Sequence, residues 1–192
     1  MKIFWLLILL LSIDASAADR LPLWQLDPTD SRMSFGSIKN TTIRETHTFK
    51  LLNGRVDSTG NIVVEVDLMS VDTRIPIRDE RMRNLLFKMG SAARVSAEVD
   101  MQAVIKLAES EGLTLELNAR LQLNGNESLL PLTLKLTRLS DSQVQVVSEG
   151  SIDVAEYGYL PGIEALREIA GLQHISTVVP YQLTLLFEKT SP

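Results

Sequence analysis

The clearest pattern in the chain is a strict alternation of apolar and polar residues that begins at Leu113. Apolar side chains occupy positions 113, 115, 117, 119, 121 and 123, and polar ones occupy the positions between them. A period of two is typical of a β-strand with one buried and one solvated face. Asn124 and Gly125 predict a tight turn, and residues 130–136 repeat the alternation. The two segments are therefore expected to form an antiparallel hairpin.

Weaker alternation elsewhere predicts further strands. A turn at 140–142 precedes a strand that contains Val144, Val146 and Ser148. The remaining expected strands are 31–38, 46–56 with a break at Asn53-Gly54, 62–68, 93–107 as one strand or a bent pair, and 181–187. About eight or nine antiparallel strands with polar outer faces exclude a parallel sheet covered by helices on both sides. An all-β barrel or sandwich fits, and barrel closure removes exposed edges.

Two segments carry the start and stop signals of helices. Residues 75–89 have Pro76 at their start and Gly90 just after their end, and residues 161–171 begin at Pro161. In both, apolar residues recur at helical spacing. Either helix can cover an open end of a barrel.

The first residues predict export. Met1-Lys2 precede nine unbroken apolar residues at 3–11, and Ala15, Ser16 and Ala17 are small residues suited to signal-peptide cleavage. The apolar run is too short for a transmembrane helix, which needs about 20 residues. We expect cleavage near Ala17, a periplasmic location without a transmembrane anchor, and a single β-barrel domain at residues 18–192.

Composition narrows the function further. The net charge is -5 and the chain has no cysteine. An acidic protein without a basic run is not expected to bind nucleic acid. The absence of cysteine excludes disulfides, thiolate metal sites and cysteine nucleophiles.

Few residues suggest catalysis. His47 and His174 are the only histidines, and no zinc, phosphate-loop or nucleophile-elbow motif occurs. Residues 78–81 (RDER) form the densest charge cluster, which we interpret as a solvated, ion-paired helix face. We therefore expect no catalytic residue, no metal ligand and no cofactor. An enzyme that uses carboxylates or the two histidines would require these groups to converge in one cleft.

The inward faces of the expected strands are mainly aliphatic, because aromatic residues make up only 5% of the chain. An eight-stranded barrel is either filled by its side chains or holds one small ligand. A partly vacant aliphatic interior suits a long flexible hydrocarbon, whereas a filled barrel would suit a module that binds partners in the cell envelope. The candidate lining residues, named from alternation, are Phe35, Val64, Val66, Leu115, Leu117, Leu134, Val146 and Leu185.

Five segments, in the right order, resemble the motifs of the YceI-like family. The opening Trp24-x-Leu26-Asp27-Pro28 resembles the family's W-x-[LV]-D-P. The others are residues 53–56, residues 71–73 with 78–83, residues 121–136, and residues 150–153 with Tyr157-Gly158. The chain departs from the family at 124–127, Arg81, 87–93 and Val154, and its 159–177 connection is longer than a plain turn.

This resemblance implies a lipocalin-like antiparallel β-barrel of about eight strands with one or two short helices. It also implies an exported protein that holds an isoprenoid or another long-chain lipid and is not an enzyme. Asp27, Ser31 and Asp79 are expected to brace loops and helix ends by local hydrogen bonds. The oligomeric state is left open.

Overall fold

Eight antiparallel strands close into a barrel. The computed structural model describes residues 23–87 and 92–190. Around the barrel the strands run β1-β3-β4-β6-β7-β8-β9-β10, and β10 pairs with β1 to close the ring. Their bounds are Trp24–Lys39 (β1), Leu52–Val56 (β3), Asn61–Asp67 (β4), Ala92–Glu98 (β6), Gly112–Leu123 (β7), Asn126–Arg138 (β8), Gln143–Asp153 (β9) and Val178–Lys189 (β10). The predicted all-β barrel is thus confirmed.

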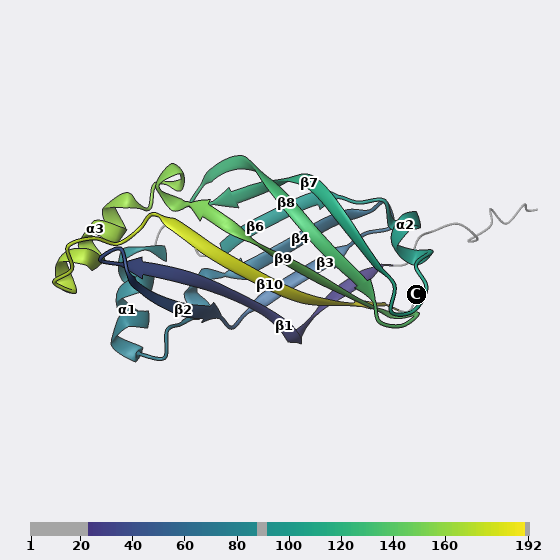
Figure 1. The fold of residues 1–192 in the computed structure, drawn as a ribbon, viewed down its shortest axis with the longest axis horizontal. Coiled ribbons are helices and arrows are strands. Elements are labelled where there is room, and N and C mark those ends of the chain that lie inside the picture. Colours follow the sequence, from purple (N-terminus) through teal and green to yellow (C-terminus); the bar gives the residue numbers. More distant parts are fainter. Residues whose placement is uncertain (1–22, 88–91, 191–192) are drawn as a thin grey trace, which may run out of the picture.

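Short elements surround the two ends of the barrel. Helices α1 (Pro76–Leu85) and α3 (Leu160–Ile169) lie at one end, and α2 (Met101–Ile105) lies at the other (Figure 1). We call these the α1/α3 end and the α2 end. Strand β2 (Ile43–Phe49) pairs with the last part of β1, and β5 (Val71–Asp72) pairs with β2. Among the described residues, Leu68–Ser70 and Val154–Tyr157 also form 3₁₀ turns. None of the helices in these ranges is long and apolar enough to cross a bilayer.

The hairpin predicted from alternation is present. Strands β7 and β8 pair from Gly112↔Thr137 to Leu123↔Asn126. Asn124 and Gly125 form the turn with φ of 51° and 77°, as a two-residue turn with left-handed backbone requires. Because alternate side chains face opposite sides, the alternating leucines at 113–123 and 130–136 point toward the interior, whereas Glu116, Arg120, Lys135 and also Leu129 lie on the solvent side.

Two predictions in the N-terminal half are wrong in detail. The 46–56 segment breaks at Lys50 and Leu51, and Asn53-Gly54 lie inside β3. The 93–107 segment is β6 followed by α2, rather than a strand or bent pair. Asp100 explains the change, because its carboxylate accepts hydrogen bonds from the backbone N–H groups of Gln102 and Ala103 and so begins a helix.

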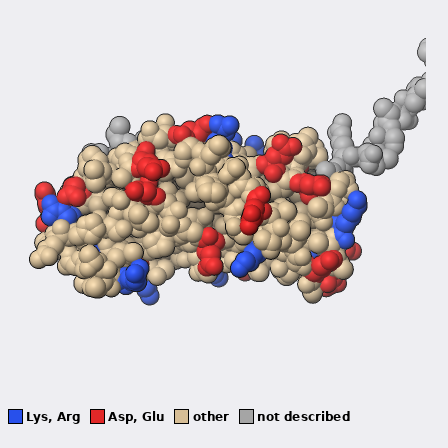
Figure 2. All heavy atoms as spheres, turned by 45° about the horizontal axis from the view of Figure 1, so that its top comes forward, with Lys and Arg blue, Asp and Glu red and all other residues tan. Residues whose placement is uncertain are grey.

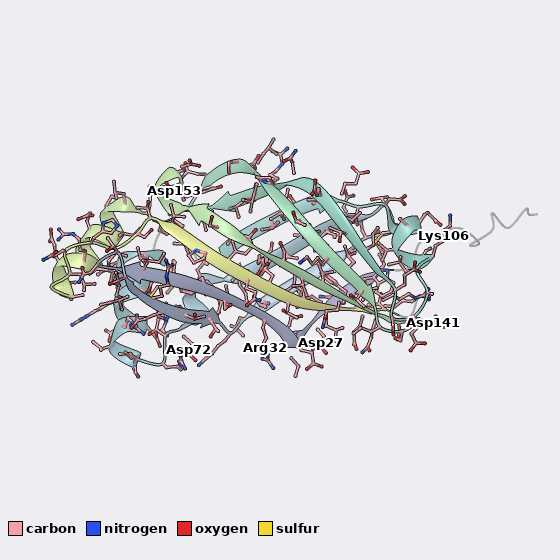
Figure 3. The ribbon with its side chains drawn as sticks, viewed as in Figure 1. Asp27, Arg32, Asp72, Lys106, Asp141 and Asp153 are labelled. Atoms are coloured by element: carbon pink, nitrogen blue, oxygen red, sulfur yellow. The ribbon has the colours of Figure 1, made fainter. Side chains whose placement is uncertain are left out.

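A bulge bends β1 where its register against β10 shifts. Asp27 and Arg32 lie on either side of it (Figure 3). The Asp27 carboxylate accepts a hydrogen bond from the Thr29 N–H at 2.7 Å, so its local bracing role is confirmed. The hydroxyl of Ser31 is buried and accepts from the Leu186 N–H at 3.0 Å, so it braces the neighbouring strand rather than its own loop.

The two predicted helices pack against each other at the α1/α3 end. They are slightly shorter than expected, and residues 88–89 of the predicted 75–89 helix lie outside the described ranges. Gly162 in α3 permits the close approach, because a Cβ there would stand 2.4 Å from the Leu85 carbonyl oxygen and 2.8 Å from Leu86 Cδ2. The absence of a side chain at this position sets the spacing of α1 and α3.

Replacing Gly162 with alanine tests this contact. In an unconstrained helix the change would stabilise the protein by up to about 1 kcal/mol. Here the added methyl meets backbone, so we expect a loss of about 1–3 kcal/mol in the free energy of unfolding. Urea unfolding followed by circular dichroism measures it, and a stability equal to or above that of the wild type would contradict the packing.

Candidate functional site

The barrel encloses a cavity of about 490 Å³. This volume lies within the range of pockets that bury small ligands. Its wall is formed by inward-facing side chains of seven of the eight barrel strands, all but β3, together with β2, α1 and α3. The alternation that produced the strands therefore also produced the apolar wall, because every second residue points inward.

Six of the eight candidate lining residues lie on this wall: Phe35, Val64, Val66, Leu134, Val146 and Leu185. Leu115 and Leu117 do not, although both are half-buried against the core. They belong to the part of β7 that extends beyond its pairing with β6, which covers only Arg120 to Gln122. A role for any of the eight in ligand binding stays a prediction.

The wall is more aromatic than the composition suggested. Phe35, Phe49, Phe87, Phe187, Tyr159 and Tyr181 all line the cavity. Phe35 stacks on Phe49 with ring centroids 4.7 Å apart, and edge-on contacts at 5.8 Å and 6.1 Å continue the row through Phe87 to Tyr159. Sequence alone could not reveal this concentration, since the six rings come from five separate segments.

The cavity opens at the α1/α3 end. Several of the residues that line it are also exposed to solvent. They include Ile75 just before α1, Ile77 and Arg81 within α1, and Ile169 at the end of α3. At the α2 end the buried side chains of Trp24, Met101 and Val104 lie outside the lining and fill the barrel. The barrel is therefore a pocket closed at the bottom rather than a tunnel.

A polar cluster lies beside the opening. The Glu45 carboxylate is ion-paired with Lys39 and, at 2.7 Å, with Nη1 of Arg78. Burial opposes ionisation of Glu45, but its hydrogen bond to Lys39 and the charges of Lys39 and Arg78 lower its pKa. Arg78 also donates to the Thr73 carbonyl oxygen at 2.9 Å, which holds the start of α1 against β5.

His47 is buried next to this cluster. Its Nε2 shares a hydrogen bond with Ser37 Oγ at 3.1 Å and lies 3.8 Å from Glu45 Oε2. Burial, aided by the charge of Arg78, lowers its pKa to about 4, so the imidazole is neutral at neutral pH. A Ser–His–acid relay needs the hydroxyl and the carboxylate on opposite ring nitrogens. Here both approach Nε2, which does not fit that mechanism.

Several cavity residues carry buried polar atoms that have no hydrogen-bond partner within the described ranges. They are His47 Nδ1, Arg78 Nε and Tyr159 Oη. Burial also raises the pKa of Tyr159 to about 12, which keeps its hydroxyl protonated. Buried polar groups are normally paired, and unpaired ones need an explanation such as a ligand. In the sequence, the hydroxyl of Ser148 in the inward-facing apolar row of β9 was the available indication of polar groups in the cavity.

The charged RDER segment is only partly the solvated, ion-paired face that its sequence suggested, because Glu80 and Arg81 are exposed and Arg78 is ion-paired but half-buried. Asp79 is buried and accepts hydrogen bonds from the backbone N–H and the hydroxyl of Thr73, which confirms its bracing role. Arg78 and Arg81 line the cavity. His174 lies in the exposed segment after α3 and does not line the cavity, so the two histidines do not converge. Among residues 23–87 and 92–190, no three His, Asp or Glu side chains are grouped to hold a metal ion.

The lowered pKa of His47 predicts a pH-dependent stability. Between about pH 6.5 and pH 4 the unfolded chain binds a proton that the folded protein excludes, so stability falls as the pH falls. The loss attributable to His47 reaches at most about 3 kcal/mol.

Urea unfolding at pH 7 and pH 4.5 measures this dependence, because a difference of one pKa unit between the folded and unfolded states corresponds to about 1.4 kcal/mol of stability. His47→Gln should lose part of it, and the matched change at exposed His174, His174→Gln, should keep it. Identical pH dependence in all three proteins would contradict the assignment.

Comparisons with known proteins agree on one family. The model of the YceI-like domain matches residues 24–187. A polyisoprenoid binding domain from Saccharophagus degradans, described as implicated in plant cell wall breakdown, is 37% identical with a TM-score of 0.84, covering 87% of this chain and 98% of that chain.

Two more distant structures support the fold alone. Burkholderia cenocepacia BcnA is 14% identical with a TM-score of 0.64, covering 84% of this chain and 98% of that chain. A Campylobacter jejuni YceI protein is 11% identical with a TM-score of 0.52, covering 76% and 85%. The comparison with curated proteins finds no match. Since the family match extends over nearly the whole barrel, and the Saccharophagus domain is similar in both sequence and fold, the chain belongs to the family of YceI-like domains.

Proposed function

We propose that this protein is an exported carrier that holds a long-chain lipid of the isoprenoid type inside its barrel. The observation that carries the proposal is the apolar cavity, closed at the α2 end and open at the α1/α3 end. The likeness to a polyisoprenoid binding domain at 37% identity supports the same class of ligand.

The distribution of polar groups gives the ligand an orientation. The hydrocarbon chain lies along the aliphatic and aromatic wall, where it is removed from water. The polar end of the lipid lies near the opening, where Lys39, Arg78 and the unpaired Nδ1 of His47 are placed. A headgroup that accepts hydrogen bonds would pair with the donors of Lys39 and Arg78, and His47 Nδ1 would donate to it or accept from it according to the tautomer of the ring.

Burial of the chain provides enough free energy for useful binding. Each buried methylene contributes about 0.8 kcal/mol, so a dozen contribute about 10 kcal/mol. Association and ordering cost about 4 kcal/mol or more, and the remaining ~6 kcal/mol corresponds to an affinity of tens of micromolar, which further buried methylenes would strengthen. Such a complex is tight enough to protect a lipid from water and weak enough to release it.

The alternatives are less well supported. A filled barrel that acts only as an interaction module requires side chains to occupy the interior, whereas the wall here leaves about 490 Å³. An enzyme requires convergent acid–base groups, and the geometry around His47 lacks a relay. We therefore propose a binding role without catalysis.

Export is part of the proposal and is supported by the sequence. The expected signal peptide at residues 1–17 lies outside the described residues. Its apolar run at 3–11 and the small residues Ala15 and Ala17 fit removal during transport across the inner membrane. The periplasm separates two membranes, so a lipid carrier there would shield hydrocarbon chains from water.

A substitution that fills the cavity tests the ligand. Val64 faces the cavity on β4, and the preceding residue, Val63, points to the opposite side of the strand. Val64→Trp should lower the amount of lipid that co-purifies with the protein, as measured by organic extraction and mass spectrometry. Excluding only two methylenes would cost about 1.6 kcal/mol, or roughly tenfold in affinity.

Val63→Trp is the matched control and should retain the lipid. Both variants are checked for cooperative thermal unfolding, and Ser148→Leu provides a second, milder change in the wall. A folded Val64→Trp protein with the same lipid content as the wild type would contradict the proposed site, as would a wild-type protein that neither yields a lipid nor binds an added polyprenol.

Cleavage of the signal is tested on protein recovered from the periplasmic fraction. We expect the chain to begin at Ala18 and its intact mass to be below the 21.4 kDa of the full chain. Ala17→Leu should slow processing, because signal peptidase requires a small residue at that position. Retention of Met1 in the wild type, or its recovery only from the cytoplasm, would contradict export.

A further inference from the structure

The opening of the cavity is surrounded by exposed isoleucines. Ile75 and Ile77 at the start of α1 are 45% and 53% exposed, and Ile169 at the end of α3 is 50% exposed. Ile43, also 50% exposed, continues the inward row of β2 beyond Glu45 and His47. Single exposed apolar residues are ordinary, but a group around one opening indicates an interaction surface. We call these four residues the isoleucine rim.

Hydrogen bonds and ion pairs hold the elements of the rim together. Glu45 of β2 is paired with Arg78 of α1, which connects the segments of Ile43 and Ile77. The Asn40 side chain accepts hydrogen bonds from the backbone N–H groups of Gln173 and His174, which connects the β1–β2 turn to the segment after α3. The rim is therefore built on elements fixed to one another rather than on a free loop.

The rim is continuous with the interior of the barrel. Ile75, Ile77 and Ile169 are exposed and at the same time line the cavity. A hydrocarbon chain could thus move from the surface at the rim to the cavity along apolar side chains without crossing a polar barrier. A surface that only bound a protein partner would have no need for this continuity.

The charges at the opening differ in sign from the protein as a whole. The chain has a net charge of -5, and acidic side chains are spread along the barrel wall seen in Figure 2. The charged residues that line the cavity are Lys39, Arg78 and Arg81, and all three are basic. Residues 74–83, which include α1, carry four arginines against Asp79 and Glu80, so an anionic surface would attract the α1 side of the opening, whereas Glu164 and Glu168 place negative charge on α3.

We propose that the isoleucine rim docks on the surface of an anionic lipid bilayer, with the opening of the barrel facing the lipids. The isoleucines enter the boundary between headgroups and acyl chains, and the basic residues lie among the phosphates, as in other interfacial attachments. The proposal rests on the proposed lipid-carrying function for its purpose, but the attachment itself follows from the rim and its charges.

Vesicle flotation tests the docking. The probes are vesicles of three parts phosphatidylethanolamine to one part phosphatidylglycerol, and vesicles of phosphatidylcholine alone. The wild type should float with the anionic vesicles, bind the neutral ones more weakly, and lose part of its anionic binding as salt is raised. All proteins are made as the full chain in the same host, so the N-terminal segment is the same in each.

Substitutions distinguish vesicle binding through the isoleucine rim from nonspecific binding to vesicles. The double variant Ile77→Gln with Ile169→Gln should bind the anionic vesicles about tenfold more weakly, because two half-exposed isoleucines no longer enter the lipid. The matched control is Leu23→Gln, since Leu23 is also 53% exposed but precedes β1 at the α2 end. It should bind as the wild type does. Arg81→Gln should reduce the salt dependence.

Three results would overturn the docking. The wild type fails to bind either kind of vesicle, the rim and control variants lose vesicle binding equally, or the rim variant loses no vesicle binding. Lipid content measured on the same proteins distinguishes this proposal from the preceding one. Ile43→Gln changes the one rim residue that does not line the cavity, so it should weaken vesicle binding and still hold the lipid, whereas Val64→Trp should lose the lipid and still bind vesicles.

Discussion

The pairing of β1 with β10 is the constraint on which the rest of the structure depends. It joins the two ends of the chain, from Trp24↔Lys189 to Phe35↔Tyr181, and converts a meander into a ring of eight strands. Ring closure satisfies the backbone groups that an open sheet would leave at its edges. It also sets the radius, because eight strands leave an interior just wide enough for side chains or one small ligand.

The two ends of this ring differ in how far side chains fill them, and the difference creates a cavity that is open at one end only. At the α2 end, α2 and the first residues of β1 place large buried side chains across the axis. At the α1/α3 end, two helices pack against each other through Gly162 and leave the axis open beside them. A barrel sealed at both ends would be only a core, and one open at both ends would admit water along its length.

The polar cluster at the opening combines stability with recognition. Glu45 is satisfied by Lys39 and Arg78, so the half-buried carboxylate does not carry an unpaired charge. His47 and Tyr159 retain buried atoms without partners, which costs stability in the ligand-free protein. Under the proposed function, the remaining hydrogen bonds of this cluster would be made by the polar end of the ligand, next to the proposed isoleucine rim.

The sequence by itself determined the strands and the polarity of their faces, because a period of two forces alternate side chains to opposite sides, as in Leu113 to Leu123. It also indicated both helices near the opening through Pro76 and Pro161.

Only the tertiary structure decided which residues meet. Phe35, Phe49 and Phe87 come from separate segments, and Glu45 meets Arg78 across 33 positions. Leu115 has the same alternation as Leu121, yet only Leu121 lines the cavity, because β6 ends its pairing between them. Local periodicity fixes the direction of a side chain, whereas the depth at which it lies depends on the length and stagger of the neighbouring strands.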